Sequence, residues 1–485
     1  MHFLRLLAFF AALTTARAEL SLPHIFSDHM VLQADQPAPV WGWADPGESV
    51  TVTFSGQEKR TTAAADGRWM VRLDALPVSA TPADLTVAAH ETKVFTDVLV
   101  GEVWLCSGQS NMEKPLGEQR GQKPTFNAEG EIRAADFPLI RLFKVAKAKA
   151  SAPARDLQGA WTPCSPETID RIKFSAAGYF FGRTIHRELN VPVGLIDSSW
   201  GGTRIEVWTP PGGFAALPSL ADFSDALKTP GQKAEGSEPA SLYHAMIHPL
   251  VPFALRGVLW YQGETNIIDI PDGDPRYLDK MRALVQGWRE LWQREFSFYY
   301  VQIAPHLYHV VRPAQVVSPE ATPLHWELQT AAQRLSRTGM IVTTDLVDDL
   351  ADIHPRNKKD VGERLARWAL AKDYGKTDVE VSGPVFQRME ISGARAILHF
   401  DHIGGGLVAN DGKALTWFTV AGVDGKFFPG VATIEGDTVV VASPGVSAPT
   451  VVRFAWDEAA RPNLANKAGL PAGPFRTNNP FTKTP

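Results

Sequence analysis

The sequence predicts an α/β protein with a doubly wound parallel sheet in its central domain and a β domain on each side of it. Short alternating runs separated by turn residues fill residues 19–98, and similar runs return over residues 376–485. Between them, over residues 99–375, continuous apolar runs alternate with amphipathic helical patterns, which is typical of parallel strands joined by helices. A chain of 485 residues is also too long for one hydrophobic core, so several domains are expected.

Residues 1–18 read MHFLRLLAFFAALTTARA and differ from everything that follows. Arg5 precedes an apolar stretch from Leu6 to Leu13, and the segment ends in Ala16-Arg17-Ala18. This pattern is typical of a secretory signal peptide, and the apolar stretch is too short to span a bilayer. We therefore predict an exported protein, periplasmic or secreted, that has no membrane partner once the signal peptide is cleaved.

The two flanking segments are predicted to be β domains because they carry short strand-like runs and no helical period. The N-terminal segment, 19–98, has the runs VTVTF, WMVRL and LTVAA with turn signals between them, which predicts a β-sandwich-like domain. The C-terminal segment, 376–485, has ARAILHF, TVVVA and VVRFAW. Its Gly- and Pro-rich residues after 458 suggest an extended tail.

The central segment, 99–375, is predicted to be the catalytic domain. Its strand candidates are EVWLCS, VPVGLIDSS, RGVLWYQ, FSFYYVQIA and GMIVTTD, and residues 277–292 place their apolar side chains on one helical stripe. Polar, mostly Gly-containing motifs follow four of these strands: CSGQSN, SSWGGT, QGETN and DLVDDLADIHP. Functional sites of such sheets gather at the carboxyl ends of the strands, so we expect the four motifs to meet at one rim.

Charge and cysteine content narrow the possible functions. The net charge of −5 implies no broad basic surface, so nucleic acid is not an expected partner. Cys106 and Cys164 are the two cysteines, and the sequence leaves open whether they pair. We find no Cys/His spacing of the kind that binds zinc and predict no metal.

Ser110 and His354 are the candidate nucleophile and base. Gly108 allows a sharp turn after the first strand of the central segment, which presents Ser110 at the rim, and a serine needs a base because its hydroxyl is a weak nucleophile. His354 lies in a loop ahead of a predicted helix, with Pro355 restricting the backbone and Asp352 two residues earlier. Each motif alone is more often a turn or helix cap, but together they fit acyl transfer.

Donors for a developing oxyanion are predicted from two other strand ends. Gly201 and Gly202 allow backbone N–H groups to approach a substrate closely, and Gln262 and Asn266 offer side-chain amides. Glu264 in the same QGETN motif is a second candidate for the carboxylate that orients the histidine.

Four long motifs carry a resemblance to a known family. The runs LCSGQSNME, VGLIDSSWGGTRIEVW, AMIHPLVPFALRGVLWYQGETN and DIHPRNKKDVGERLA resemble the sialate O-acetylesterase family, which belongs to the SGNH-type hydrolases. The opening LPHIFSDHMVLQ and the late PFRT are also similar, so the likeness spans nearly all of the mature chain.

The resemblance implies an SGNH-type α/β/α domain between β domains, hydrolysis of O-acetyl esters on carbohydrates, and no cofactor. It implies Ser110 as the nucleophile and His354 as the base. The family generally places an Asp three residues before the His, but that position is Ala351 here, so Asp352 is preferred over Glu264. Asp348 and Asp349 are weaker candidates. The GxND pattern is absent, which leaves the side-chain oxyanion donor open between Gln262 and Asn266.

The predicted function is that of an exported serine esterase that removes O-acetyl groups from a sugar or glycan, with sialic acid as the preferred substrate. Arg204 and Arg356 are candidates to bind the carboxylate of sialic acid. The alternatives are an acetyl xylan or other hemicellulose esterase, which would use the same machinery, and a carbohydrate-binding protein with a catalytically dead domain. The oligomeric state is left open.

Overall fold

Strand β7 (Thr92–Gly108) joins the N-terminal strands to the central sheet. Its first half alternates between exposed and partly buried residues, whereas every residue from Val98 to Gly108 is buried. Strand β6 pairs with residues 92–100 and β1 with residues 99–101, whereas β10 pairs with residues 102–108 and β11 with residues 104–108. The predicted boundary at residues 98 and 99 therefore falls inside one strand.

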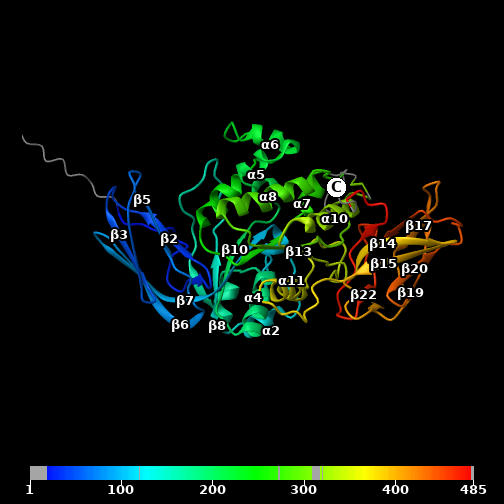
Figure 1. The fold of residues 1–485 in the computed structure, drawn as a ribbon, viewed down its shortest axis with the longest axis horizontal. Helices are drawn as coiled ribbons and strands as arrows, with labels where there is room; N and C mark the ends of the chain where they lie inside the picture. The colour runs from blue at the N-terminus through cyan, green and yellow to red at the C-terminus, as the bar shows by residue number, and fades with distance from the viewer. Residues whose placement is uncertain (1–18, 120, 271–272, 309–316, 319, 482–485) are drawn as a thin grey trace, which may run out of the picture.

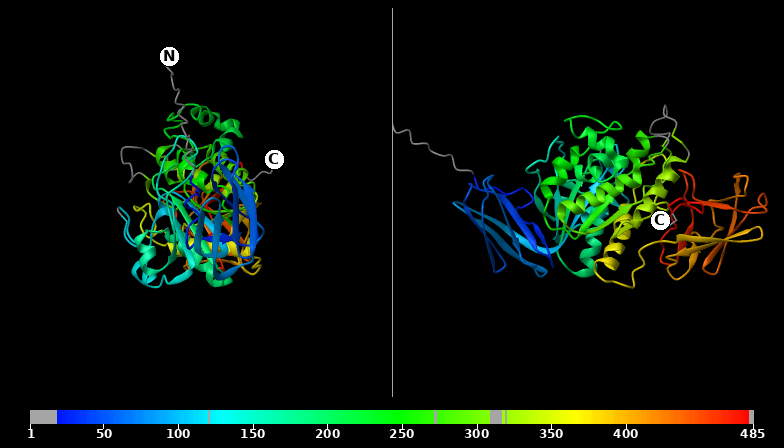
Figure 2. Two further views of the ribbon diagram at one scale, coloured as in Figure 1. Left: turned by 90° about the vertical axis from the view of Figure 1, so that its left-hand side faces the viewer. Right: turned by 45° about the horizontal axis from the view of Figure 1, so that its top comes forward.

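The computed structural model describes residues 19–119, 121–270, 273–308, 317–318 and 320–481. The predicted signal peptide lies outside these residues. Figures 1 and 2 show the N-terminal strands, a centre covered by helices and the C-terminal strands following one another along the long axis. No helix within the described ranges is long and apolar enough to cross a membrane.

The central sheet has the order β13-β12-β11-β7-β10-β8-β9. Six of these strands are parallel, and β9 at the edge runs antiparallel to β8. The prediction of an α/β fold with a parallel sheet is confirmed, and the antiparallel edge is the departure from it. The strands other than β7 are β8 (Phe137–Lys144), β9 (Trp161–Cys164), β10 (Val193–Ser199), β11 (Gly257–Tyr261), β12 (Ser297–Val301) and β13 (Thr338–Ile341).

Helices cover both faces of this sheet. Figure 1 shows α4 and α11 on one side and α8 and α10 on the other. The helices are α1 (Ser110–Glu113), α2 (Ala128–Arg133), α3 (Pro166–Arg171), α4 (Ala176–Leu189), α5 (Pro211–Ala215), α6 (Ala221–Ala226), α7 (Glu264–Asp269), α8 (Tyr277–Trp292), α10 (Ala321–Ala331) and α11 (Lys358–Lys372). Shorter helical turns are η1 (Ile205–Val207), η2 (Pro218–Leu220), η3 (Tyr243–Ile247), η4 (His248–Leu250) and η5 (Ala332–Arg334).

Alternate residues of each central strand enter separate cores because side chains on a strand point to opposite faces. In β11, Val258 and Trp260 pack in one core with Trp288 of α8. Leu259 and Tyr261 pack in the other, which also contains side chains of α4 and α11. The helix predicted over residues 277–292 is confirmed as α8, and its apolar stripe faces the first core.

In the N-terminal segment β1, β3, β4 and β6 join the sheet of β7 and β2 pairs with β5, whereas the C-terminal segment consists of small separate sheets. The N-terminal strands are β1 (Val31–Gln33), β2 (Ala38–Trp43), β3 (Ser49–Phe54), β4 (Gln57–Thr62), β5 (Arg68–Leu73) and β6 (Ser79–Ala88). The C-terminal strands are β14 (Val385–Ser392), β15 (Arg395–Asp401), β16 (Leu407–Ala409), β17 (Phe418–Ala421), β18 (Phe427–Pro429), β19 (Val431–Glu435), β20 (Thr438–Ala442), β21 (Val451–Phe454), β22 (Leu464–Asn466) and β23 (Phe475–Arg476).

Two sequence-based expectations change in the structure. The residues after 458 are not an extended tail, because β22 pairs with β16 and β23 pairs with β21. Strand β8 was not predicted; its interior Arg141 is buried and forms an ion pair with Asp97. Cys106 and Cys164 are both buried free thiols, which answers the open question of their pairing.

Gly108 supports a stability prediction because it ends β7 where no side chain fits. A Cβ there would lie 2.2 Å from the carbonyl oxygen of Tyr261, and φ is +136°. Gly56 also has a positive φ, +78°, but a Cβ there would meet nothing within 4 Å. We expect Gly108→Ala to lower the free energy of unfolding by about 3 kcal/mol or more and Gly56→Ala by about 1 kcal/mol, measured by urea denaturation. Equal losses would contradict the steric argument.

Candidate active site

Strands β10, β7 and β11 lie side by side and end at the same level. Gly108 is paired with Ser199 on one side and Tyr261 on the other, so the segments that follow these residues emerge together. The chain order of the sheet reverses at β7, since later strands are added on both of its sides. In sheets of this type ligands bind in the crevice at such a switch point.

Ser110 is the first residue of α1 and follows the end of β7 at this switch point. It is partly exposed, whereas Ser107 is fully buried inside β7. Gly201 lies against it, because a Cβ on Gly201 would be 3.0 Å from the Cβ of Ser110. Of the two serines in CSGQSN, Ser110 is thus the one that a substrate can reach.

His354 lies beside Ser110 although the two are far apart in sequence. Its Nε2 is 2.9 Å from the Ser110 Oγ, which is hydrogen-bond distance. Burial lowers the pKa of His354 to about 4; the nearby charge of Lys358 acts in the same direction and Asp352 opposes it. The imidazole is therefore neutral at ordinary pH and able to accept a proton from the serine.

The loop that carries His354 is fixed on both sides. The backbone N–H of His354 donates to Asp352 Oδ1 at 2.9 Å. Helix α11 begins at Lys358, with Asn357 as its N-cap accepting from the backbone N–H of Asp360 at 3.1 Å. The helix that we predicted just after Pro355 is present, but Asn357 rather than the proline caps it.

Among the carboxylates considered for orienting the histidine, Asp352 is near the far ring nitrogen. The distance from Asp352 Oδ1 to His354 Nδ1 is 3.6 Å, which is longer than a hydrogen bond. The other candidates have different partners: Glu264 accepts from Asn111, Asp348 from the backbone of Arg356, and Asp349 from Lys123.

A buried polar chain missed by the sequence analysis lies behind the Ser110–His354 pair. Lys358 Nζ donates to Asn111 Oδ1 at 2.8 Å. Asn111 Nδ2 donates to Glu264 Oε1 at 2.5 Å and to the carbonyl of Ile353 at 3.0 Å. Because Asn111 follows Ser110 and Ile353 precedes His354, this chain ties the serine turn to the histidine loop.

The ionisable ends of that chain are both perturbed by burial. Lys358 and Glu264 are 0% and 1% exposed. Burial lowers the pKa of Lys358 to about 7 and raises the pKa of Glu264. Among the described residues, Glu264 Oε2 has no hydrogen-bond partner. Only the position of Asn111 next to Ser110 could have indicated this chain, since a lysine in the first turn of a helix normally reads as solvent-exposed.

Most of the residues predicted as oxyanion donors already have hydrogen-bond partners within the protein. The N–H of Gly201 donates to Glu113 Oε2 at 2.6 Å, and Gly202 is exposed beside it. Gln262 is fully buried, and its amide nitrogen donates to Asn266 Oδ1 at 2.7 Å. The amide of Asn266 in turn donates to Glu206 at 3.1 Å. Gln262 and Asn266 thus belong to a buried hydrogen-bond network that ends at Glu206.

That network continues into a cluster of charges around Lys280. Its Nζ lies 2.6 Å from Glu206, 2.7 Å from Glu235 and 2.6 Å from Asp274. These three carboxylates have a spacing that a metal ion could also use, but the ammonium group of Lys280 lies among them. Arg204 is buried here as well and pairs with Glu206 at 2.9 Å.

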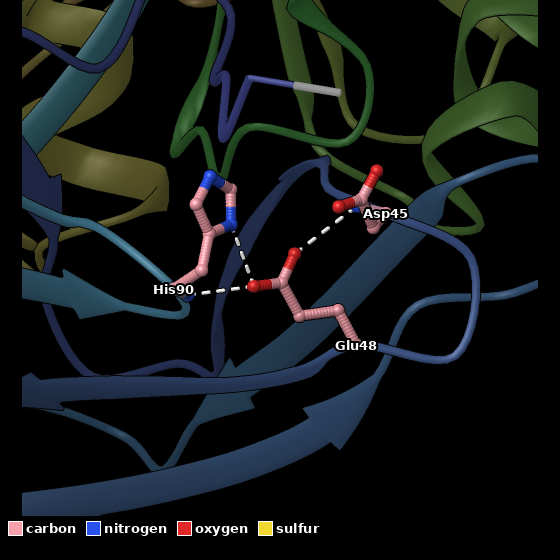
Figure 3. A group of neighbouring side chains, drawn as sticks. All are labelled: Asp45, Glu48 and His90. Carbon is pink, nitrogen blue, oxygen red and sulfur yellow. Dashed lines mark hydrogen bonds and ion pairs between the residues drawn. The ribbon is translucent and has the colours of Figure 1, made fainter. Parts of the chain in front are cut away.

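A second group with metal-like spacing, formed by Asp45, Glu48 and His90, lies in the N-terminal segment (Figure 3). Glu48 accepts from both the backbone N–H and the Nδ1 of His90 at 2.6 Å and from the backbone N–H of Asp45 at 3.1 Å. Glu48 thus joins two turns, which accounts for its position without a ligand.

Comparison with known proteins identifies the family. Residues 100–371 match the family described as carbohydrate esterase, sialic acid-specific acetylesterase. The sialate O-acetylesterases of Homo sapiens and Rattus norvegicus are each 32% identical to this chain, over 422 and 434 residues. The human alignment covers 78% of this chain and 75% of that protein; the rat alignment covers 77% of each. This chain belongs to the sialic acid-specific acetylesterase family of carbohydrate esterases.

A solved structure supports the same assignment over the whole fold. The crystal structure of a carbohydrate acetylesterase from Xanthomonas citri is 36% identical to this acetylesterase family member, with a TM-score of 0.83. The match covers 95% of this chain and 100% of that one. The sequence-based prediction of a carbohydrate O-acetylesterase is thereby confirmed at the level of the family.

The two candidate carboxylates can be separated by isosteric substitutions. Asp352→Asn removes the charge near His354 Nδ1, so we expect kcat for acetate release to fall by about a hundredfold or more. Glu264→Gln keeps an oxygen that can accept from Asn111, so we expect a loss of less than tenfold. Steady-state kinetics with 4-nitrophenyl acetate compare them, and the reverse ranking would assign the acid to Glu264.

The pH dependence of kcat/KM tests the surroundings of His354. With its pKa lowered to about 4, the neutral base is present above that pH and is lost as the pH falls through it. Lys358→Met removes a positive charge that holds this pKa down, so the acidic limb should move to higher pH. Lys359→Met, next along α11 and paired with Glu363 at the surface, is the matched control and should leave the limb in place. A shift to lower pH would contradict this account.

Proposed function

We propose that this protein is an exported serine esterase with an SGNH-type site that removes O-acetyl groups from sialic acid. The single observation that carries the mechanism is the 2.9 Å contact between Ser110 Oγ and His354 Nε2 at the switch point of the sheet. The reaction is inferred from family membership, and the contact identifies the nucleophile and the base that acyl transfer requires.

In the proposed mechanism, Ser110 Oγ attacks the acetyl carbonyl while its proton passes to His354 Nε2. The tetrahedral intermediate collapses when His354 returns the proton to the sugar oxygen, which leaves as an alcohol. Water then attacks the acetyl-serine while His354 takes its proton, and His354 returns that proton to Ser110 Oγ as acetate departs. Asp352 stabilises the imidazolium that forms in both steps.

In this proposal, backbone N–H groups donate the hydrogen bonds that stabilise the oxyanion. The amide of Ser110 and that of Gly202 are our candidates, because the Gly201 amide is engaged by Glu113 and the Gln262 amide by Asn266. In this proposal Gly201 and Gln262 shape the crevice: Gly201 leaves room next to Ser110, and Gln262 anchors the end of β11 to the network below.

Sialic acid is the proposed sugar because the curated relatives are named for it. An esterase acting on acetylated hemicellulose remains the second candidate, since the Xanthomonas citri relative is described more broadly as a carbohydrate acetylesterase. A dead, purely sugar-binding domain fits poorly, because a Ser–His contact at hydrogen-bond distance has no part in binding alone. Export is proposed from the composition of residues 1–18.

Ser110→Ala tests the mechanism and has a control in the same peptide. We expect this variant to fold normally and to lose several orders of magnitude in kcat for 4-nitrophenyl acetate and for O-acetylated sialic acid. Ser107→Ala should keep its activity, because the Ser107 hydroxyl is buried and, among the described residues, has no hydrogen-bond partner. Near wild-type turnover by Ser110→Ala would overturn the proposal.

A further inference from the structure

The residue that follows β10 is a tryptophan, and the glycine after it lies against the nucleophile. Trp200 directly follows β10, is partly exposed, and precedes Gly201, whose backbone contacts Ser110. The N–H of Trp200 donates to the carbonyl of Gly108 at 3.0 Å, and its own carbonyl accepts from the Thr203 hydroxyl at 2.7 Å. The backbone of Trp200 is therefore fixed next to the turn that holds Ser110.

Two lysines from a separate loop lie against this tryptophan. Lys147 Nζ is 5.5 Å and Lys149 Nζ is 5.6 Å from the centre of the Trp200 ring, within the range of cation–π attraction. The backbone of their loop is fixed on both sides, since Ala146 donates to Gln158 at 2.8 Å and Ala150 donates to Ser241 at 3.0 Å. The two charges are thus placed by the fold rather than by chance on a free loop.

One of the two lysines has a carboxylate partner and the other does not. Lys147 forms a 2.5 Å ion pair with Glu113 Oε1, and the other oxygen of Glu113 binds the Gly201 amide. This places Lys147 near the last residue of α1, the short helix that Ser110 begins. Lys149 is exposed, and in the part of the chain that the structure describes no carboxylate contacts it. One uncompensated positive charge therefore lies beside the aromatic ring.

The arginines expected from the sequence are less suited to bind a substrate anion. Arg204 is 5% exposed and pairs with Glu206 and Glu235, so its charge is already neutralised. Arg356 lies over the ring of Phe126, and its Nε donates to the carbonyl of Pro124 at 2.8 Å. Arg356 is the rival cation that an experiment has to separate from the lysines.

We propose that Trp200, Lys147 and Lys149 form a subsite for an anionic sugar, in which the ring of Trp200 packs on the apolar side of the sugar and Lys149 binds its carboxylate. The inference rests on the proposed esterase function and adds to it the basis for choosing sialic acid over a neutral acetylated sugar. Lys147 positions the pair by linking Trp200 to Glu113.

The test compares two substrates that differ in one charge: 9-O-acetyl-N-acetylneuraminic acid and its methyl ester, with acetate as the product measured. We expect the wild type to favour the free acid in kcat/KM by about tenfold. Lys149→Gln should reduce that ratio about fivefold, mainly through KM, and Arg356→Gln should leave the ratio near the wild-type value. Added salt should also weaken the preference.

Lys426→Gln is the matched control, because it makes the same change on the exposed surface of the C-terminal segment and should alter neither substrate. The subsite proposal would be overturned if the wild type showed no preference for the free acid, or if Arg356→Gln removed that preference and Lys149→Gln did not. In either case, Ser110-dependent hydrolysis of 4-nitrophenyl acetate would leave the esterase assignment intact. Absence of acetate release from both sugars and from 4-nitrophenyl acetate would overturn the esterase and the subsite together.

Discussion

The in-register pairing of β7 with β10 and β11 is the constraint on which the site depends. It brings Gly108, Ser199 and Tyr261 to one level, so that the turn holding Ser110, the Trp200-Gly201 turn and the Gln262 turn emerge side by side. Backbone hydrogen bonds within a buried sheet leave little freedom for these ends. The histidine alone comes from a longer loop, and it is the element that needs additional ties.

The contacts that hold the histidine loop include buried charges, whose desolvation costs free energy. Lys358 and Glu264 lose nearly all of their hydration, and their joint attachment to Asn111 recovers only part of it. A hydrophobic pair in place of Lys358 and Glu264 would fill the same space. It would leave Asn111, whose amide binds the Ile353 carbonyl, without the two partners that orient it. Burial is the main cause of the lowered pKa of His354, and the positive charge of Lys358 acts in the same direction, so the residue that helps to position the base also favours its unprotonated form.

The sequence predicted the sheet, its flanking β segments and the places where Ser110 and His354 emerge, because continuous apolar strands and the turns after them are local signals. The direction of a side chain is set by the tertiary structure and has no such local signal. Gln262 and Asn266 are amides at a strand end, and only the fold shows that their amide nitrogens donate to Asn266 and Glu206 inside a buried network. Charged residues normally lie at the surface, but the tertiary structure buries three of them beside partners that are distant in sequence: Arg204, Lys280 and Lys358.

The two proposals assign acyl transfer and substrate choice to different parts of the chain. The groups proposed for acyl transfer lie on strand ends and on the loop before α11, all supported by the two hydrophobic cores. The proposed cationic subsite lies on the loop between β8 and β9, which contacts the reacting centre through Glu113 and Trp200. Exchanging Lys149 for a neutral residue leaves every contact of Ser110 and His354 in place. If the subsite is as proposed, the preferred sugar can change through this loop while the Ser110–His354 pair stays as it is.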